Sequence, residues 1–286
     1  MEAIMTTGIV LEGGAMRGMY TAGVLDVIME NKLEFDYAVG VSAGATFGCN
    51  LVSRQIGRTI RYNVRFAKDP RYGSFRSLIK TGDFYGADFC YRTLPEKLDV
   101  FDTDAIESNP LKFYVVTTDI DTGLPCYHKL VNGKHNDLDW TRASASMPVF
   151  SRPVELEGKR MLDGGMSDAI PVHFMEQLGA DKIVVVLTQP REYLKPGDDL
   201  KRTIKFLSHK YPKLAETMEK RPAVYNETLA YIAYKEKKGE LFVIRPPKKL
   251  EIGKIEHDPE KMEEVYRIGR DETMRRLDDL KSYLEQ

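Results

Sequence analysis

Residues 37–45 read Tyr-Ala-Val-Gly-Val-Ser-Ala-Gly-Ala, an apolar run that ends at a serine between two glycines. The first five of these residues have the composition of a buried strand, and helical spacing continues after Ser42 through Val52. Gly40, Ser42 and Gly44 fit the pattern G-x-S-x-G, in which glycines permit a sharp, strained turn that presents the serine outward. We predict a strand, a turn and a helix with Ser42 as nucleophile. The alternative is a small-residue turn in which Ser42 caps the helix.

A second glycine-rich segment, Gly13-Gly14-Ala15-Met16-Arg17-Gly18, lies between a predicted strand at 9–12 and a predicted helix at 21–29. Backbone N–H groups in such a turn point at an anion. The dinucleotide pattern G-x-G-x-x-G is one glycine out of register, and Met19-Tyr20 stands where a P-loop requires Lys-Ser/Thr. An oxyanion hole that serves Ser42 is therefore a better interpretation than a nucleotide site.

The rest of the chain divides by composition. Apolar segments rich in β-branched residues at 113–118 and 183–188 predict buried parallel strands, so we expect an α/β sheet covered by helices on both faces. Charged residues make up about 23% of residues 1–189 and about 42% of residues 190–286. We predict a catalytic core over 1–190 and a charged, mostly helical region over 191–286, packed on that core. Its expected elements are helices at 200–207, 223–234 and 259–284 and a strand at 241–245.

Composition also excludes several classes of protein. With 42% hydrophobic residues and a formal charge of -1, the chain of 286 residues is neither disordered nor charged overall in a way that favours nucleic acid. Its three cysteines form no CxxC pair, which argues against a disulfide framework and a thiolate zinc site. No basic and apolar leader opens the sequence. We expect a cytoplasmic protein without metal or nucleic acid, which touches a membrane only from outside.

Asp163-Gly164-Gly165 follows an alternating stretch at 154–162. Such a triplet is often an ordinary turn, but together with a serine turn it becomes a candidate general base. Asp168 is a competitor for that role, or a helix cap. His173 follows Ser42 and Asp163 in the Ser, Asp, His order of the α/β-hydrolases, which leaves a triad open.

Taken together, these segments resemble the patatin-like phospholipase family over residues 8–190. The resemblance rests on four segments in family order: Gly13 to Gly18 continued by Gly23-Val24-Leu25, Gly40 to Gly44, Arg142-Ala143-Ser144-Ala145-Ser146-Met147-Pro148, and Asp163-Gly164-Gly165 with Pro171 beyond. It implies a three-layer α/β/α fold with a mainly parallel central sheet and a Ser-Asp dyad. The charged C-terminal part is similar to an extension of some bacterial members.

The resemblance also implies roles for individual residues. Ser42 is the implied nucleophile and Asp163 the implied base, while the implied oxyanion loop consists of Gly13, Gly14, Ala15, Arg17 and Gly18. Asp163 would accept the Ser42 proton as Ser42 attacks the ester carbonyl of a lipid such as a phospholipid or lysophospholipid, without a metal or organic cofactor. Ala15 departs from the family, which usually has glycine there, and a positive φ at Ala15 would strain the loop. A small-ester carboxylesterase and a catalytically weakened lipid- or protein-binding member are the alternative functions.

Two further features bear on the substrate. Four arginines recur at spacings of four, three and four, which on a helix places them on one face. They are Arg54, Arg58, Arg61 and Arg65. This basic stripe is a candidate surface for anionic headgroups or a membrane, or else a solvated face. Arg17 is a candidate for a headgroup phosphate or a plain exposed arginine. The apolar segment 75–89 is a candidate lid or wall of an acyl pocket, or part of the core.

Overall fold

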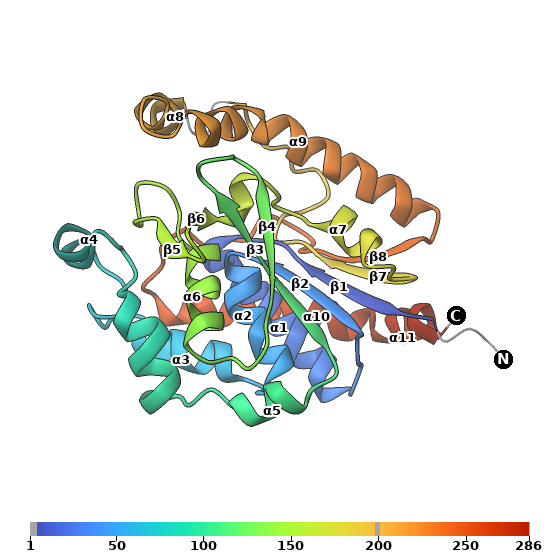
Figure 1. Cartoon of the computed structure of the whole chain (residues 1–286). Coiled ribbons are helices and arrows are strands. Elements are labelled where there is room, and N and C mark those ends of the chain that lie inside the picture. Colours follow the sequence, from blue (N-terminus) through green and yellow to red (C-terminus); the bar gives the residue numbers. More distant parts are fainter. Residues whose placement is uncertain (1–4, 198–200, 286) are drawn as a thin grey trace.

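A mixed β-sheet runs through the centre of the molecule (Figure 1). The computed structural model describes residues 5–197 and 201–285, and within them the strand order is β5-β6-β3-β2-β1-β7-β8, with β4 paired to β3. The parallel strands are β1 (Thr7–Leu11), β2 (Tyr37–Val41), β3 (Lys112–Asp119), β7 (Lys182–Val186) and β8 (Leu241–Ile244). The antiparallel strands are β4 (Pro125–Lys129), β5 (Val154–Leu156) and β6 (Lys159–Asp163). The predicted α/β class and its mainly parallel sheet are confirmed.

Helices cover both faces of this sheet, because successive residues of each central strand point to opposite sides. In β1, Ile9 and Leu11 pack with one apolar cluster and Val10 with the other. The first cluster includes α1 (Gly18–Glu30), α2 (Ala43–Val52), α3 (Arg58–Phe66) and α10 (Pro259–Arg275). The second includes α7 (Val172–Gln177) and α9 (Pro212–Lys237), which lie above the sheet in Figure 1. The layers are those of an α/β/α fold.

Shorter elements connect these layers. Between α3 and β3 lie α4 (Phe75–Thr81), a π-helical segment (Phe89–Leu98) and α5 (Thr103–Ser108). α6 (His135–Ser144) packs its Trp140 and Ala143 against β5 and β6. Two single-turn helices, η1 (Ala15–Arg17) and η3 (Gly164–Met166), follow β1 and β6. They place the two glycine-rich sequences at the edge of the sheet where the parallel strands end.

The C-terminal region contributes to every layer. α8 (Lys201–Leu207) precedes α9, and α11 (Leu277–Glu285) follows α10. β8 extends the sheet beside β7, while α10 packs against α1 so closely that a Cβ on Gly23 would lie 2.1 Å from the Tyr266 carbonyl oxygen. Leu200, where one predicted helix begins, lies outside the described residues. No helix in the described part of the chain is long and apolar enough to cross a membrane.

One predicted element is wrong. The segment 259–284 is two helices with a break at Arg276, where the sequence pattern predicts one. The break turns α11 back toward the sheet, and the Tyr283 hydroxyl there accepts from the Ile183 N–H at 3.0 Å and donates to the Glu240 carbonyl at 3.0 Å. Arg276 packs its guanidinium 4.3 Å from the centre of the Phe242 ring. These are tertiary contacts that helical periodicity does not encode.

Candidate active site

The turn between β2 and α2 holds Ser42 in a strained conformation. Ser42 has φ 55° and ψ -118°, in a region that residues other than glycine seldom adopt. A Cβ on Gly44 would lie 2.4 Å from the Leu11 carbonyl oxygen, and one on Gly40 would lie 2.4 Å from the Gly44 carbonyl oxygen. The glycines are therefore required by close backbone approach, which forces the chain through a sharp turn at the serine.

A second serine holds this turn in place. The Ser42 N–H donates to Ser144 Oγ at 2.8 Å, and Ser144 Oγ donates to the Val116 carbonyl at 2.6 Å. Ser144 is fully buried at the end of α6, so the bridge ties the serine turn to β3. Sequence reasoning assigns Ser144 no role, although it belongs to the segment 142–148 on which the family resemblance rests.

Asp163 approaches Ser42 along the same edge of β3. Val41 pairs with Val116 across the parallel β2–β3 ladder, and Asp163 pairs with Thr117 across the antiparallel β3–β6 ladder. β4 pairs with Tyr114 to Thr118 along one edge of β3, so β2 and β6 follow one another along the opposite edge, and the end of β6 at Asp163 lies next to the turn at Ser42. Both side chains line one cleft of about 160 Å³.

Burial controls the charge of Asp163. Only 3% of the residue is exposed, and this burial raises the pKa of the Asp163 carboxyl from 3.8 to about 6. Hydrogen bonding from Ser42, a 2.8 Å bond from the Gly165 N–H and the positive charge of Arg221 limit the rise in pKa. The carboxylate is therefore the prevailing form above about pH 6, and it is basic enough to accept a proton near neutrality.

The glycine loop after β1 lines the cleft next to Ser42. Gly13, Gly14, Ala15 and Arg17 all contribute to the cleft wall, whereas Gly18 begins α1. Among the described residues, the N–H groups of Gly13 and Gly14 donate no hydrogen bond. Ala15 has φ 49°, the left-handed conformation that would make its Cβ a source of strain, at a cost of about 1–2 kcal/mol.

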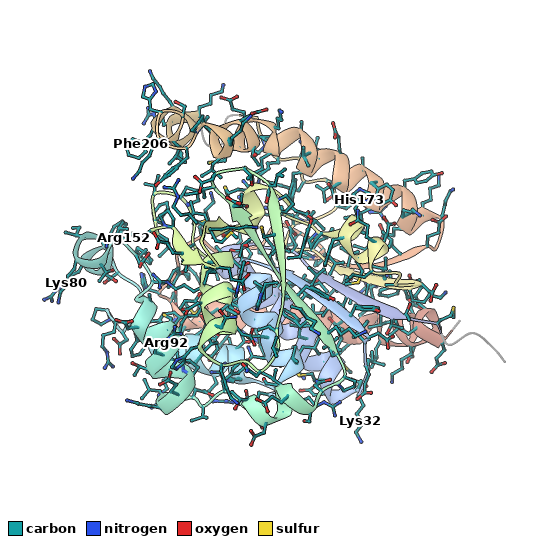
Figure 2. All side chains as sticks on the ribbon, viewed as in Figure 1. Lys32, Lys80, Arg92, Arg152, His173 and Phe206 are labelled. Carbon is teal, nitrogen blue, oxygen red and sulfur yellow. The ribbon has the colours of Figure 1, made fainter. Side chains whose placement is uncertain are left out.

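The two competing site residues lie elsewhere. Asp168 accepts a 2.8 Å hydrogen bond from the Tyr127 hydroxyl and lines a separate cavity. His173 is exposed on α7, where its Nδ1 lies 3.1 Å from a Glu176 carboxylate oxygen (Figure 2). Neither lines the cleft that contains Ser42. The described residues therefore do not assemble a Ser-His-Asp triad.

The predicted arginine stripe is wrong, since its four members do not share a helix face. α3 begins at Arg58, so Arg54 precedes it and pairs with Glu34 at 3.0 Å. Arg58 is only 4% exposed and donates to the Asp99 carbonyl. Arg61 donates two hydrogen bonds to the Asp99 carboxylate, at 2.7 and 2.8 Å, and Arg65 donates one to the Leu98 carbonyl at 3.2 Å. Arg58, Arg61 and Arg65 hold the segment 98–101 against α3, a structural role that spacing alone does not reveal.

Ser42 also borders a second, apolar cavity of about 120 Å³. Apolar and aromatic side chains from α2, the segment 84–101 and the segment 147–151 form most of its wall. Phe84 and Tyr85 are among them, so part of the segment 75–89 is a pocket wall. α4, in the same segment, buries none of its residues.

Helix α9 braces both the glycine loop after β1 and the loop after Asp163. The Tyr225 hydroxyl donates to the buried Glu12 carboxylate, which also accepts from the Thr188 N–H at 2.6 Å. Arg221 Nε donates to the Gly165 carbonyl, two residues after Asp163. Sequence reasoning misses these residues, because Tyr225 and Glu12 are 213 positions apart and no local pattern joins them. The one feature of the sequence that points to these contacts is Glu12, an acidic residue directly before Gly13.

Comparisons with known proteins give relatives of several kinds. The uncharacterized protein YjjU of Escherichia coli strain K12 is 30% identical over 267 residues, which cover 92% of this chain and 74% of that protein. Lysophospholipase nte1 of Aspergillus oryzae is 30% identical over 63% of this chain, and neuropathy target esterase sws of Drosophila melanogaster is 29% identical over 68%. The matches span only 12% and 14% of those two proteins. The solved structure of VipD from Legionella pneumophila has 13% identity and a TM-score of 0.47, over 97% of this chain and 67% of that one.

Two family models match different parts of the chain. Residues 211–285 match a domain of unknown function (DUF6363). Residues 9–175, more than half of the 286 residues, match the patatin-like phospholipase model, and this range contains the serine turn, the glycine loop and Asp163. The chain therefore belongs to the patatin-like phospholipase family and is a lipid acyl hydrolase.

Proposed function

We propose that this enzyme cleaves the carboxylic ester of a phospholipid or lysophospholipid through a Ser42–Asp163 dyad, with the oxyanion held by the N–H groups of Gly13, Gly14 and Ala15. The observation that carries the proposal is the shared cleft, which brings a serine on a strained turn together with a buried carboxyl whose pKa is about 6. A serine nucleophile requires a nearby base of this kind.

The proposed reaction has two halves. Asp163 accepts the Ser42 proton as Oγ attacks the ester carbonyl, and the glycine loop stabilises the resulting oxyanion, each donor contributing about 10²–10³-fold in rate. Collapse of the tetrahedral intermediate breaks the ester bond, and the leaving alcohol takes the proton from Asp163. Asp163 then takes a proton from water as this water attacks the acyl-serine. When the second tetrahedral intermediate collapses, Asp163 returns the proton to Ser42 Oγ, which releases the fatty acid and regenerates Ser42.

The apolar cavity beside Ser42 favours a lipid over a small ester. Its wall is formed mainly by groups that cannot hydrogen-bond, so burial of an acyl chain there gains about 0.8 kcal/mol for each methylene removed from water. A short-chain ester would leave most of this space without a ligand. We therefore place the acyl chain in the apolar cavity and the reacting carbonyl at Ser42, where the cavity meets the cleft.

Labelling with a fluorophosphonate tests the proposed nucleophile. We expect one adduct in the intact mass of the wild-type protein, mapped to Ser42 by peptide sequencing. The labelling rate should rise with pH through about 6, since only ionised Asp163 activates the serine. An adduct at another residue, or no adduct on the folded protein, would contradict the proposal.

We further propose that this enzyme acts in the cytoplasm and meets its substrate at a membrane surface. Its three cysteines are unpaired, as is usual in reducing compartments. On α4, Phe75 is 66% and Ile79 87% exposed, and Phe206 on α8 is 73% exposed. Figures 1 and 2 show both helices projecting at the end of the molecule where β5 and β6 lie. α4 leads into the wall of the apolar cavity, and Thr203 of α8 lines the cleft.

A negative charge introduced into the exposed apolar surface of α4 tests membrane contact. The substitution Ile79→Asp should weaken sedimentation with vesicles of anionic phospholipid by about tenfold, because burial of an isoleucine gains about 1.5–3 kcal/mol. Hydrolysis of a water-soluble ester should not change. Val131→Asp is the matched control, as Val131 is an exposed apolar residue outside α4, α8 and both cavities. Equal vesicle binding by the two variants would rule out α4 as a contact surface.

A further inference from the structure

Ser42 lies where two cavities of opposite character meet, and the mechanism uses only one of them for substrate. The apolar cavity takes the acyl chain, whereas the cleft on the other side of Ser42 has no assigned ligand. Among the described residues, the cleft is lined by four cationic and two acidic side chains: Arg17, Lys195, Arg221, Lys254, Glu12 and Asp163. The whole chain has a formal charge of -1, so this positive excess is a local feature.

Two of the cations come from the region that matches the domain of unknown function. Arg221 is on α9, and its charge lowers the pKa of Asp163, which places the guanidinium beside the catalytic carboxyl. Its Nε donates to the Gly165 carbonyl. A guanidinium has five N–H donors in a planar fork, so it can hold a backbone carbonyl and an anion at the same time.

Lys254 occupies the boundary between the two cavities. It lies between β8 and α10 and lines both the apolar cavity and the cleft. Its ammonium group forms no hydrogen bond or ion pair with another described residue. With the acyl chain in the apolar cavity, the part of the substrate on the other side of the ester oxygen would extend out of the cavity past this ammonium group. The same cleft is lined by Arg17, whose buried Nε also has no partner among the described residues.

The wall that carries these cations is fixed before a ligand arrives. Tyr225, one turn after Arg221 on α9, donates to the buried Glu12 carboxylate next to the glycine loop. Lys195 packs its ammonium 4.7 Å from the centre of the Tyr225 ring. A preformed site loses less conformational entropy when it binds its ligand.

We propose that the cleft binds the phosphate of a lipid headgroup, with Arg221 and Lys254 of the C-terminal region and Arg17 of the glycine loop as phosphate ligands. This inference rests on the proposed function and extends it. It gives residues 211–285 a role in substrate choice: they select esters that carry an anionic phosphate a few bonds from the scissile carbonyl. Arginine forks and lysine point charges are the usual ligands of phosphate oxygens.

Paired substrates test the proposal. Octanoyl lysophosphatidic acid and octanoylglycerol share the acyl ester and the glycerol and differ only in the phosphate, and the short chain allows measurement below the micellar concentration. We expect the wild type to prefer the phosphate-bearing ester in kcat/KM. Arg221→Gln should reduce this preference by about tenfold or more and Lys254→Gln by about threefold, because the lysine is exposed to solvent. Lys220→Gln, one position from Arg221 and paired with Glu216 outside the cleft, should leave the preference unchanged.

The ratio of the two kcat/KM values distinguishes recognition of the phosphate from a purely structural role of the mutated residue. A merely structural role of Arg221 would lower both values equally, and an unchanged ratio in both variants would overturn the proposal while hydrolysis itself persists. Loss of the proposed function would instead appear as no turnover of either ester by the wild type. Inorganic phosphate distinguishes the source of the ligand. If it inhibits octanoylglycerol hydrolysis at micromolar concentration while the substrate ratio is one, the cleft is a site for free phosphate and the proposal fails.

Discussion

The substitution Ser42→Ala should abolish hydrolysis, with kcat for a lysophospholipid falling by about 10⁴- to 10⁶-fold. Alanine removes the oxygen that forms the acyl-enzyme, and the oxyanion donors alone accelerate attack by water only weakly. The fold should persist, because Ser42 uses its backbone N–H, and not its side chain, to hold the turn against Ser144. Release of fatty acid measures the loss, and a thermal melt of the variant verifies that it is folded.

A matched serine controls for the effect of the mutation itself. Ser151 lines the apolar cavity but lies outside the serine turn, so Ser151→Ala should retain activity within about threefold. If the Ser42 variant kept more than a tenth of the wild-type rate, the nucleophile would be another residue. Ser146, which is buried and donates to the Arg142 carbonyl at 2.8 Å, would then be the first alternative.

The substitution Asp163→Asn should separate activity from stability. We expect kcat to fall by about 10³- to 10⁴-fold, because an amide cannot accept the Ser42 proton. The rise of activity with pH through about 6 should disappear with the carboxyl that causes it. The amide oxygen of the new side chain would still accept from the Gly165 N–H, so the local turn can remain. A pH profile of kcat/KM for both proteins measures the effect.

The same variant should be more stable than the wild type at alkaline pH. The pKa of Asp163 is raised from 3.8 to about 6 in the folded state, so its contribution to stability is present at low pH and is lost as pH rises through 6. A shift of about two pKa units corresponds to about 3 kcal/mol. Denaturant unfolding should therefore favour the variant at about pH 8, and the difference should shrink toward about pH 4. A variant that is less stable at both pH values would contradict this account.

Asp168→Asn is the matched control for the loss of activity. Asp168 is also a buried carboxyl whose pKa is raised by burial, and it accepts a hydrogen bond from Tyr127. Because it lines a separate cavity, its loss should leave kcat within a few-fold of the wild type. A large loss of activity would return Asp168 to the list of candidate bases.

The sequence predicts the parts of the site that are built from neighbouring residues. Gly40, Ser42 and Gly44 form a pattern within five positions, and the apolar composition of 37–41 is enough to identify β2, although Gly44 also packs against the distant Leu11 carbonyl. These features depend on local backbone geometry, which short patterns encode. The pairing of Asp163 with Ser42 is implied by the family resemblance and not by periodicity, and no pattern in the sequence predicts the order of the strands.

The remaining parts depend on contacts between distant residues. Ser144 lies 102 positions from Ser42, and Arg221 lies 56 positions from Gly165. The arginine stripe fails for the same reason, since a buried Arg58 requires the Asp99 carbonyl as a partner and spacing cannot supply it. Helical periodicity places side chains on a face, but tertiary packing decides whether that face meets solvent, lipid or protein.

The position of β8 limits how this protein can be divided or fused. A chain cut between β7 and β8 would leave β7, with the sequence Lys-Ile-Val-Val-Val, as an unpaired edge strand. Such edges recruit strands from other molecules, so the catalytic half alone would be prone to aggregate. The cut would also remove the helix that braces the glycine loop after β1 and the loop after Asp163. A fusion protein must therefore include both regions of the chain to retain the reaction, even though two different family models match them.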